Sequence, residues 1–333
     1  YWNSLLPFDA GPFLKHEFLS SLEETGCVGN NTGWQTAHLV LKSDQGMVGA
    51  IPLYLKQHSY GEYVFDWSWA QAYEQQGMNY YPKALCAIPF TPVQGSRLLV
   101  KPELDRTLFT SKLIAGLKSL VQNNHLSSAH VLFPKEEEIE LLNAHGFLLR
   151  DSVQFHWQNQ NYKDFDQFLS ALTMKRRKNI RREREIVSAQ NITFRHIPGR
   201  DSTDQDWEFF YACYANTYYE HQSQPYLNES FFKLWASRSP EDLHLIVAHR
   251  DGLPIASSLI VVDTAMSKAY GRYWGALEHI PLLHFEAAYY QAIEYWIFTN
   301  DDSIRPFHSR PQICQGCGTI FRQRAPRHYS VCR

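Results

Sequence analysis

Apolar residues recur at helical spacing in the first part of the chain. In residues 12–24 they occupy positions 13, 14, 18, 19 and 22, which fall on one face of a 3.6-residue period, and Gly26 follows as a stop signal. Residues 108–122 and 136–145 show the same period. We therefore expect three helices before residue 150, each with one apolar face.

Strand signals alternate with these helices. Residues 36–41 and 47–56 are short apolar runs separated by a Ser-Asp-Gln-Gly turn, which predicts a β-hairpin with a wide loop. Residues 128–133 predict another strand. Residues 59–81 are dense in Tyr, Trp and Phe and are followed by Pro82, so we expect a loop region there. Interleaved helices and strands predict a mixed α/β class.

A similar order recurs after residue 150. The Asp251-Gly252 turn supplies the positive φ that a tight hairpin needs, and it joins two strand-like runs. In each half a hairpin precedes an aromatic segment that contains glycine, YGEYVFDWSW in the first and YGRYWGALEHI in the second. We infer two copies of one fold, residues 1–150 and 151–297. The other elements predicted in the second half are strands at 153–158 and 192–196, a long helix at 165–189, helices at 206–220 and 228–238, and a hairpin at 243–263.

Several strings in these segments resemble one bacterial family. They include PFLKHEFLSSLEETGCV, NYYPKALCAIPFTPVQGSRLL, KRRKNIRRERE, YGRYWG and LHFEAAYYQAIEYWI, and the resemblance covers about residues 2–297. The chain is similar to FemAB-like proteins, which are often labelled peptidoglycan-biosynthesis or GNAT-type proteins. The resemblance implies two tandem GNAT-like (acyl-CoA N-acyltransferase) domains, each with a mixed twisted sheet and flanking helices. It also implies transfer of an acyl or aminoacyl group to an amine.

The resemblance ends near residue 297. Members of the family usually continue with a Gly-Glu-His-Lys-type motif, an Arg-Gly-Phe and a His-Trp ending, and residues 298–333 contain none of these. Either the terminus has been replaced or the reading frame has changed. The spacing of Cys314, Cys317, His328 and Cys332 in this tail suits tetrahedral zinc. The alternative is a tail without a metal site.

Charge and cysteine content exclude several classes of protein. The 333 residues include 32 Lys and Arg against 34 Asp and Glu, so no global charge steers the chain to DNA or to a membrane surface. No apolar run reaches the roughly 18–20 residues of a bilayer span, and the first residues do not follow the signal-peptide pattern. The six cysteines are too sparse for a disulfide framework. We expect a cytoplasmic protein with no membrane span.

Large aromatic residues surround a single carboxylate in the first half. Asp66 lies among them, and an acid in apolar surroundings has a raised pKa that suits acid or base catalysis near neutrality. Aromatic walls with one carboxylate also suit an amine-binding pocket. The alternative is an aromatic core in which Asp66 caps a helix that begins near Ser68. The candidate substrate-binding residues are Trp67, Trp69, Tyr80, Tyr81, Phe90 and Thr91.

The second half combines a cation, aromatic rings, an imidazole and a carboxylate. Amine acylation needs a group that deprotonates the attacking ammonium and donors that stabilise the tetrahedral oxyanion. His284 and Glu286 are candidates for the first role, although positions two apart do not share a helix face. Arg272 is a candidate for the second role, and Tyr273 and Trp274 are candidate substrate-binding residues. The alternative is an aromatic core with His284 hydrogen-bonded inside it.

Seven positive charges fall within residues 175–184, on a predicted helix. Such a density is self-repelling unless anions lie near it, and the chain has no comparable acidic run. We therefore expect this helix to bind a phosphate-bearing donor, such as a nucleotide-linked lipid or a tRNA backbone. The alternative is a solvated helix that Glu183 and Glu185 partly neutralise. The candidate phosphate-binding residues are Lys175, Arg177, Lys178, Arg181 and Arg182.

These patterns predict an N-acyltransferase or aminoacyltransferase that modifies an amine of a cell-envelope precursor or a small metabolite. The expected donor is acyl-CoA or aminoacyl-tRNA. No clean Gln/Arg-x-x-Gly-x-Gly/Ala loop is present, which disfavours acetyl-CoA and favours an activated amino acid or loss of catalysis in one half. The rival is a non-catalytic binding protein that keeps the fold and its aromatic cleft. An enzyme keeps a titratable group beside converging donors, whereas a binder needs only the aromatic wall.

Overall fold

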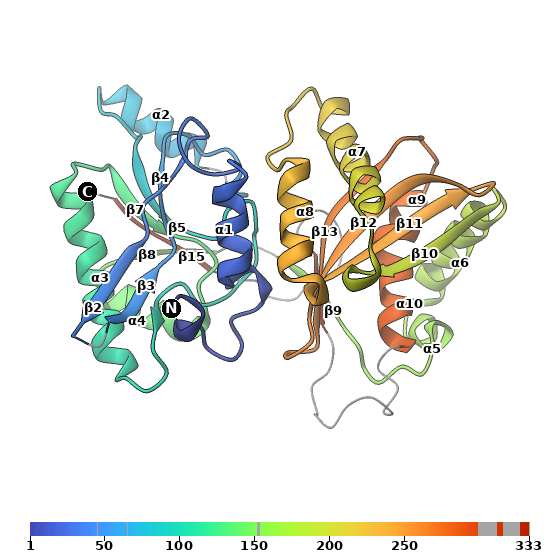
Figure 1. Cartoon of the computed structure of the whole chain (residues 1–333), viewed down its shortest axis with the longest axis horizontal. Coiled ribbons are helices and arrows are strands. Elements are labelled where there is room, and N and C mark those ends of the chain that lie inside the picture. The colour runs from blue at the N-terminus through green and yellow to red at the C-terminus, as the bar shows by residue number, and fades with distance from the viewer. Residues whose placement is uncertain (45, 65, 152–153, 299–311, 316–326, 333) are drawn as a thin grey trace. The chain divides into compact units, whose positions relative to one another are not determined.

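The chain divides into two compact units in the computed structural model. The structure describes residues 1–44, 46–64, 66–151, 154–298, 312–315 and 327–332. Unit 1 comprises Tyr1–Phe155 with Ile320–Arg333, and unit 2 comprises His156–Thr319. Each unit has its own mixed sheet with helices packed on it (Figure 1).

Unit 1 contains a six-stranded sheet in the order β1-β4-β5-β7-β15-β8 and a three-stranded sheet in the order β2-β3-β6. Strand β5 pairs antiparallel with β4 and parallel with β7. Strand β15, from the tail, pairs with both β7 and β8. The strands are β1 (Trp34–Thr36), β2 (Leu39–Ser43), β3 (Gly46–Ile51), β4 (Leu53–Lys56), β5 (Lys83–Cys86), β6 (Leu99–Val100), β7 (Ser128–Val131), β8 (Leu148–Asp151) and β15 (Arg327–Cys332). The helices are η1 (Asn3–Leu5), η2 (Pro12–Leu14), α1 (His16–Glu24), α2 (Trp67–Gln75), α3 (Arg106–Asn123) and α4 (Glu136–Ala144).

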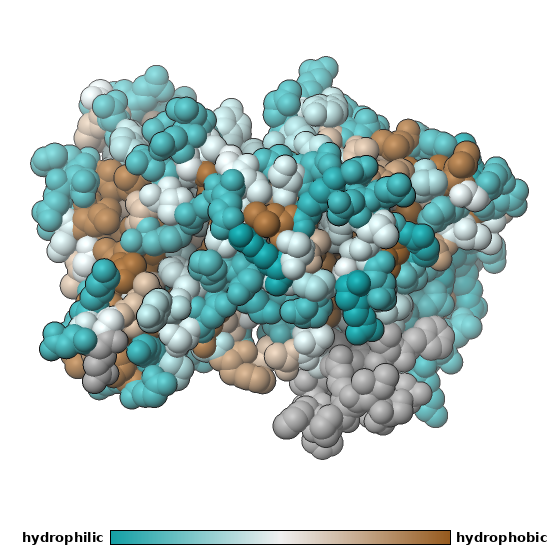
Figure 2. Space-filling model, viewed as in Figure 1, coloured by the Kyte–Doolittle hydropathy of each residue, from teal (hydrophilic) through white to brown (hydrophobic). Residues whose placement is uncertain are grey.

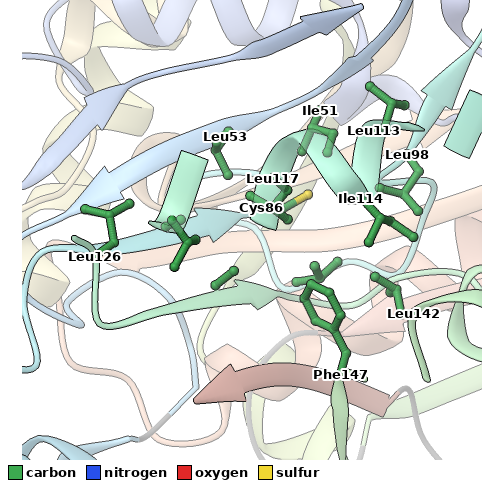
Figure 3. Packing of buried hydrophobic residues seen from close by; sticks show 14 of the residues in the cluster. Ile51, Leu53, Cys86, Leu98, Leu113, Ile114, Leu117, Leu126, Leu142 and Phe147 are labelled. Carbon is green, nitrogen blue, oxygen red and sulfur yellow. The ribbon is translucent and has the colours of Figure 1, made fainter. Parts of the chain in front are cut away.

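The central strands of unit 1 place an apolar face against the helices. Because side chains alternate across a strand, Leu53, Cys86 and Val131 point to the same side of the sheet. They pack with Leu117 of α3 and Leu142 of α4 in a buried cluster, part of which Figure 3 shows. Apolar burial of this kind supplies the main driving force for folding of the unit.

Unit 2 contains a six-stranded sheet in the order β10-β11-β12-β13-β14-β9. Strand β13 pairs antiparallel with β12 and parallel with β14, so it has the same kinds of neighbour as β5 of unit 1. The strands are β9 (Phe155–Gln158), β10 (Ile192–Pro198), β11 (Leu243–Arg250), β12 (Leu253–Asp263), β13 (Lys268–Ala276) and β14 (Gln312–Gln315). The helices are α5 (Phe165–Ser170), α6 (Met174–Ser188), η3 (Gly199–Asp201), α7 (Asp204–Glu220), α8 (Glu229–Arg238), η4 (Pro240–Asp242), α9 (Leu283–Phe285), the π-helical turn η5 (Glu286–Tyr290) and α10 (Gln291–Phe298).

Helix α7 approaches the sheet of unit 2 very closely at Gly275 on β13. A Cβ atom at this position would lie 1.8 Å from the carbonyl oxygen of Cys213. Only glycine leaves room for this contact between helix backbone and strand. The close approach fixes α7 over β13, beside the cavity described below.

Two features of the first half differ from the sequence expectation. The single strand expected at 47–56 is split at Pro52 into β3 and β4, which belong to different sheets. Proline has no N–H group to donate to a strand ladder, so the pairing changes there. The aromatic stretch expected as a loop contains helix α2 (Trp67–Gln75), whose side chains are all at least partly exposed.

The long helix expected at 165–189 is two helices. Helix α5 buries Phe165, Phe168 and Leu169 in a core that it shares with α10. Helix α6 begins after Thr173, which has an extended backbone, and it buries only Val187. The break therefore separates an apolar segment that packs from a charged segment that faces solvent.

The surface is mostly polar on the side that Figure 2 shows, where apolar residues form separate patches. This distribution is ordinary for a folded protein, since every surface retains some apolar atoms. Among the described residues, no helix is long and apolar enough to cross a membrane.

Candidate active site

The face of the unit 1 sheet opposite its apolar core carries buried ionisable groups. Lys56 on β4 lies opposite Lys83 on β5, and neither side chain is exposed. His130 on β7 is also buried and points to the same side as Lys83, because it pairs with Leu85. Residues 57–82 connect β4 to β5 and supply the partners of these groups. Buried charges of this kind must be paired or neutralised inside the protein.

Lys83 is the centre of this cluster. Its Nζ donates to Asp66 Oδ2 at 2.5 Å, to Glu62 Oε2 at 2.8 Å and to Ser59 Oγ at 3.2 Å. The Tyr80 hydroxyl donates to the same Asp66 oxygen at 2.7 Å. One ammonium thus holds two buried carboxylates, and their second oxygens, Glu62 Oε1 and Asp66 Oδ1, have no hydrogen-bond partner among the described residues.

The pKa of Asp66 is lowered, not raised as its aromatic surroundings suggested. Burial alone would raise this pKa, but the Lys83 charge and the hydrogen bonds of Lys83, Ser59 and Tyr80 outweigh burial. The expectation was wrong because it took no account of Lys83 as the partner of this carboxylate. Asp66 also occupies the position before α2 without capping it, since its carboxylate binds Lys83 instead of the helix amides.

Two neighbours of the cluster lose their positive charge readily. Burial, helped by the Lys83 ammonium and opposed by Glu62 and Asp66, lowers the pKa of Lys56 to about 7. The Lys56 Nζ lies 3.9 Å from the ring centroid of Trp34 and donates to the Tyr60 carbonyl at 3.2 Å. Burial lowers the pKa of His130 to about 3, so this imidazole is neutral at physiological pH.

The other candidates of the first half do not form one pocket. Tyr81 belongs to the Lys83 cluster, because its hydroxyl is 2.7 Å from Ser59 Oγ and the Lys83 Nζ lies 5.8 Å from its ring centroid. Trp67 is 48% exposed and Trp69 is partly exposed, both on α2. The expected aromatic wall around Asp66 therefore includes the tyrosines, whereas the two tryptophans are at least partly exposed on α2.

Phe90 and Thr91 lie in a different buried corner of unit 1. The Phe90 ring is 5.2 Å from the Trp34 ring, and the Thr91 hydroxyl donates to the Pro89 carbonyl at 2.9 Å. Both side chains are buried. These contacts hold the loop after β5, and neither of them involves Asp66.

Unit 2 contains an open cavity of about 570 Å³. This volume lies within the usual range for small-molecule sites. Its walls come from the end of α7, from strands β12 and β13, from the connection 277–282 and from the helical segment that follows it. Thr217, Glu220, Arg272, Trp274, His284 and Tyr289 are among the lining residues.

A β-bulge shapes one wall of the cavity. Leu259 pairs with Tyr273 and Ile260 pairs with Gly271, so Arg272 has no residue opposite it in β12. A bulge interrupts the ladder and changes the direction of nearby groups. The Arg272 guanidinium lies 4.8 Å from the Tyr273 ring centroid and donates to the Tyr273 hydroxyl at 3.2 Å. The expected neighbours Arg272, Tyr273 and Trp274 therefore meet in this wall.

His284 lies among aromatic rings where the helical segment after residue 282 lines the cavity. Its ring centroid is 5.4 Å from that of Trp274 and 5.4 Å from that of Tyr289. The side chain remains exposed to the cavity, and the partial cover that these rings give lowers the pKa of His284. A neutral imidazole at a cavity wall is able to accept a proton, which is the property expected of a general base.

Glu286 does not share the cavity with His284. It is buried in unit 2, where its carboxylate accepts from Arg184 Nε at 3.1 Å and from Gln291 Nε2 at 2.7 Å. Positions 284 and 286 project to different sides of the helical segment. The expectation that the two residues act together on one substrate is therefore corrected: only His284 lines the cavity.

The basic helix α6 has fewer free charges than its sequence suggests. Arg184 pairs with Glu286 and Glu294, and Arg181 pairs with Asp166 at 3.0 Å. The absence of an acidic run was misleading, because these partners come singly from other helices. The candidates that are exposed and have no ion pair with a described carboxylate are Lys175, Lys178 and Arg182, whereas Arg177 is half-buried.

The candidate zinc ligands of the tail lie on different elements. Cys314 belongs to β14 in the unit 2 sheet, and His328 and Cys332 belong to β15 in the unit 1 sheet. Cys317 lies outside the described residues. Among the residues that the structure describes, no group of three metal-binding side chains occurs together. The zinc site remains a prediction from the sequence.

Sequence reasoning missed the cations and one acid of the unit 1 cluster. Lys56, Glu62 and Lys83 all lie in the segments that the pattern singled out, at the ends of two strands and in the aromatic stretch between them. A lysine directly after Pro82 at the start of a buried strand is a usable signal, since a cation inside a sheet requires a carboxylate nearby.

Comparison with known proteins supports the fold. A family model named FemAB-like, described as peptidoglycan biosynthesis/recognition, matches residues 1–306. No curated protein sequence matches the chain. FemX has a TM-score of 0.55 at 10% identity and covers 99% of this chain and 94% of its own. The C-terminal domain (DUF2156) of a putative lysylphosphatidylglycerol synthetase from Agrobacterium fabrum has a TM-score of 0.54 at 9% identity and covers 94% and 92%. L-PGS from Bacillus licheniformis has a TM-score of 0.53 at 9% identity and covers 94% and 90%.

The expected fold class, two tandem GNAT-like α/β domains with mixed sheets and flanking helices, is confirmed.

Proposed function

Because the chain belongs to the FemAB-like family, we propose that it is an N-acyltransferase or aminoacyltransferase that modifies an amine of a cell-envelope precursor. The family description, peptidoglycan biosynthesis/recognition, supports a precursor of the envelope as acceptor. One structural relative is a domain of a putative lysylphosphatidylglycerol synthetase, and lysylphosphatidylglycerol is an aminoacyl group joined to a lipid. That name supports aminoacyl transfer as a chemistry for this fold.

The observation that carries this proposal is the cavity of unit 2, which the neutral imidazole of His284 and the bulged strand β13 both line. The acceptor amine attacks the carbonyl carbon of the donor, and a new C–N bond forms. His284 takes the proton that the nitrogen loses and passes it to the leaving thiolate or alkoxide as the C–S or C–O bond breaks. Arg272 and backbone N–H groups at the bulge stabilise the oxyanion.

Both expected donors, acyl-CoA and aminoacyl-tRNA, carry phosphates outside the reacting group. The cavity is large enough for an acyl or aminoacyl group with the acceptor amine, but not for a whole donor, so the phosphates must bind elsewhere. The exposed cations of α6, Lys175, Lys178 and Arg182, have the charge that phosphates require. In this proposal they bind the donor, with no contribution from the ion-paired Arg184.

In the first unit, Asp66 now has a structural role in this proposal. It is 1% exposed and its carboxylate is bound to Lys83 and Tyr80, so it has no free path to a substrate. We therefore propose His284, and not Asp66, as the catalytic base.

A transfer assay tests the proposal. The protein is incubated with labelled acetyl-CoA or with labelled alanyl-tRNA, together with a muramyl pentapeptide precursor that has a free side-chain amine. We expect label in the peptide, and we expect His284→Ala to lower kcat by about 10²–10⁴-fold, the usual contribution of a general base. His249→Ala removes an imidazole from the hairpin outside the cavity and is the matched control.

Absence of transfer from either donor, or a His284→Ala variant with the turnover of the parent, contradicts the proposal. The rival function, a non-catalytic binding protein, predicts a different result. The pentapeptide would then raise the melting temperature of the parent and of His284→Ala equally, without any transfer.

A further inference from the structure

The π-helical turn η5 interrupts the helical segment that forms one wall of the unit 2 cavity. It spans Glu286–Tyr290 between α9 and α10. A π turn is less stable than a regular helical turn because its wider hydrogen bonds pack the backbone less well, and such turns occur mostly at functional positions. Something outside the turn must therefore hold it in this form.

The two sides of this helical segment have different surroundings. His284, Phe285 and Tyr289 line the cavity. On the other side, Glu286 is 3% exposed and Ala287 is fully buried. One side of the segment thus lines the cavity, whereas the other side is buried in the protein.

Polar contacts reach the back of η5 from two elements. On α6, the Arg184 Nε donates to both oxygens of Glu286 at 3.1 and 3.2 Å. On β12, the Ser258 hydroxyl donates to the Ala287 carbonyl at 3.1 Å in a buried position. The Gln291 side chain closes the turn by donating to Glu286 Oε1 at 2.7 Å.

Arg184 is well placed to act as a rigid anchor. Its guanidinium also lies 4.5 Å from the Phe165 ring centroid and donates to Glu294 Oε2 at 2.5 Å. A planar guanidinium that makes several directed bonds fixes the position of a carboxylate better than an ammonium does. Glu286 belongs to the π turn and Glu294 to the regular helix α10, so one arginine holds both.

We propose that Glu286 is a positioning residue, which Arg184 holds so that the π turn presents His284 and Tyr289 to the cavity. This inference rests on the proposed function for its catalytic meaning. It assigns a role to the last arginine of the basic tract that is separate from phosphate binding. It also explains why a carboxylate two residues from His284 lies outside the cavity.

The test follows the His284 imidazole directly. Protein labelled with ¹⁵N-histidine is titrated by NMR, and the His284 signal is assigned by its loss in His284→Ala. In Glu286→Ala we expect the midpoint of His284 to rise by roughly half a pH unit or more, toward the ordinary value, because the wall loosens and the ring moves away from Trp274 and Tyr289, which cover part of it. Loss of a nearby negative charge alone would shift the midpoint down, so a rise reports movement.

Glu294→Ala is the matched control, since it removes the other carboxylate of Arg184 without touching the π turn. We expect the His284 midpoint to stay within about 0.1 pH unit of the parent in this variant. Glu286→Gln keeps an acceptor for Arg184 and should restore most of the parent value. Where Glu286→Ala does not fold, Arg184→Lys serves instead, and it should raise the midpoint less because it loses the bidentate contact.

An unchanged midpoint in folded Glu286→Ala, or equal shifts in Glu286→Ala and Glu294→Ala, overturns the positioning role. No substrate is used in this titration. A failure of the transfer assay therefore leaves its outcome intact, and the two proposals fail separately.

Discussion

Strand β5 of unit 1 and strand β13 of unit 2 have the same kinds of neighbour and very different surroundings. Each pairs antiparallel on one side and parallel on the other. Beside β5, ionisable side chains meet one another and fill the space. Beside β13, a bulge at Arg272 and the connection 277–282 leave a cavity of about 570 Å³. One strand arrangement thus supports either a closed ionic cluster or an open site.

The difference shows which features are informative about activity. A buried carboxylate is a candidate catalytic group only when no cation already binds it. In unit 1 Lys83 binds the Asp66 carboxylate at 2.5 Å. In unit 2 Arg272 and His284 line the cavity, and the ion-paired Glu286 lies outside it. Polar groups that satisfy each other stabilise the fold, whereas a substrate site keeps some of them available.

Lys83→Met should have the largest effect on stability, because it disrupts the ion cluster of unit 1. It removes the cation from two buried carboxylates, so we expect the free energy of unfolding to fall by about 3–5 kcal/mol. Urea denaturation followed by circular dichroism measures the loss. Turnover per folded molecule should persist, because the cavity of unit 2 is intact. A variant as stable as the parent would show that the cluster contributes little.

Asp66→Asn should have a smaller effect that depends on pH. The pKa of Asp66 is lower in the folded protein than in the unfolded chain, so its contribution is present above the unfolded pKa and disappears as the pH falls through the folded value. We expect a loss of about 1–3 kcal/mol at pH 7 that shrinks toward pH 3. Urea titrations at several pH values measure this. A loss that is constant with pH would assign the effect to packing.

Lys56→Met should raise the free energy of unfolding, whereas the two preceding substitutions should lower it. The pKa of Lys56 falls to about 7 on folding, so the parent gains stability as the pH rises above that value, by up to about 1.4 kcal/mol per pH unit for one proton. Methionine has no charge to bury and also packs well against Trp34. The variant should therefore be more stable than the parent at pH 6, with the difference shrinking above pH 7. Equal slopes of stability against pH contradict this pKa.

The smallest effect is expected on α6. Lys178→Gln with Arg182→Gln removes two exposed cations without an ion pair among the described carboxylates. With mixed tRNA as the probe, each cation should lower the slope of log affinity against log salt by about one. Arg181→Gln is the control, since Asp166 already neutralises Arg181, and its slope should change less. Filter binding between ~50 and ~200 mM salt measures the slopes. An unchanged slope in the double variant makes α6 a solvated face.

Local pattern predicted most of the elements. Helix α3 and the β11–β12 hairpin lie where the apolar period and the Asp251-Gly252 turn placed them. The errors fell where a competing local or tertiary effect operates. Pro52 divides a continuous apolar run. The charged part of the 165–189 stretch buries only Val187, and it forms a separate helix that begins at Met174.

The candidate site was harder to predict because its contacts are long-range. Asp66 and Lys83 are 17 residues apart, and Arg184 and Glu286 are 102 apart, distances over which no periodicity carries information. The segment around His284 was found because its aromatic residues and imidazole are adjacent in sequence. The bulge at Arg272 and the π turn are backbone features that no residue type marks.

Helix α2 buries no residue, and this has a consequence for the motion of unit 1. A helix held by few buried contacts opens at low free energy, so its amides should exchange with solvent much faster than those of β5. Asp66 directly precedes this helix, and its bond to Lys83 joins the exposed helix to the buried sheet. The ion cluster therefore limits how far local unfolding spreads. We expect the helix to unfold from Gln75 toward Trp67, and we expect this unfolding to end at Asp66, which Lys83 holds.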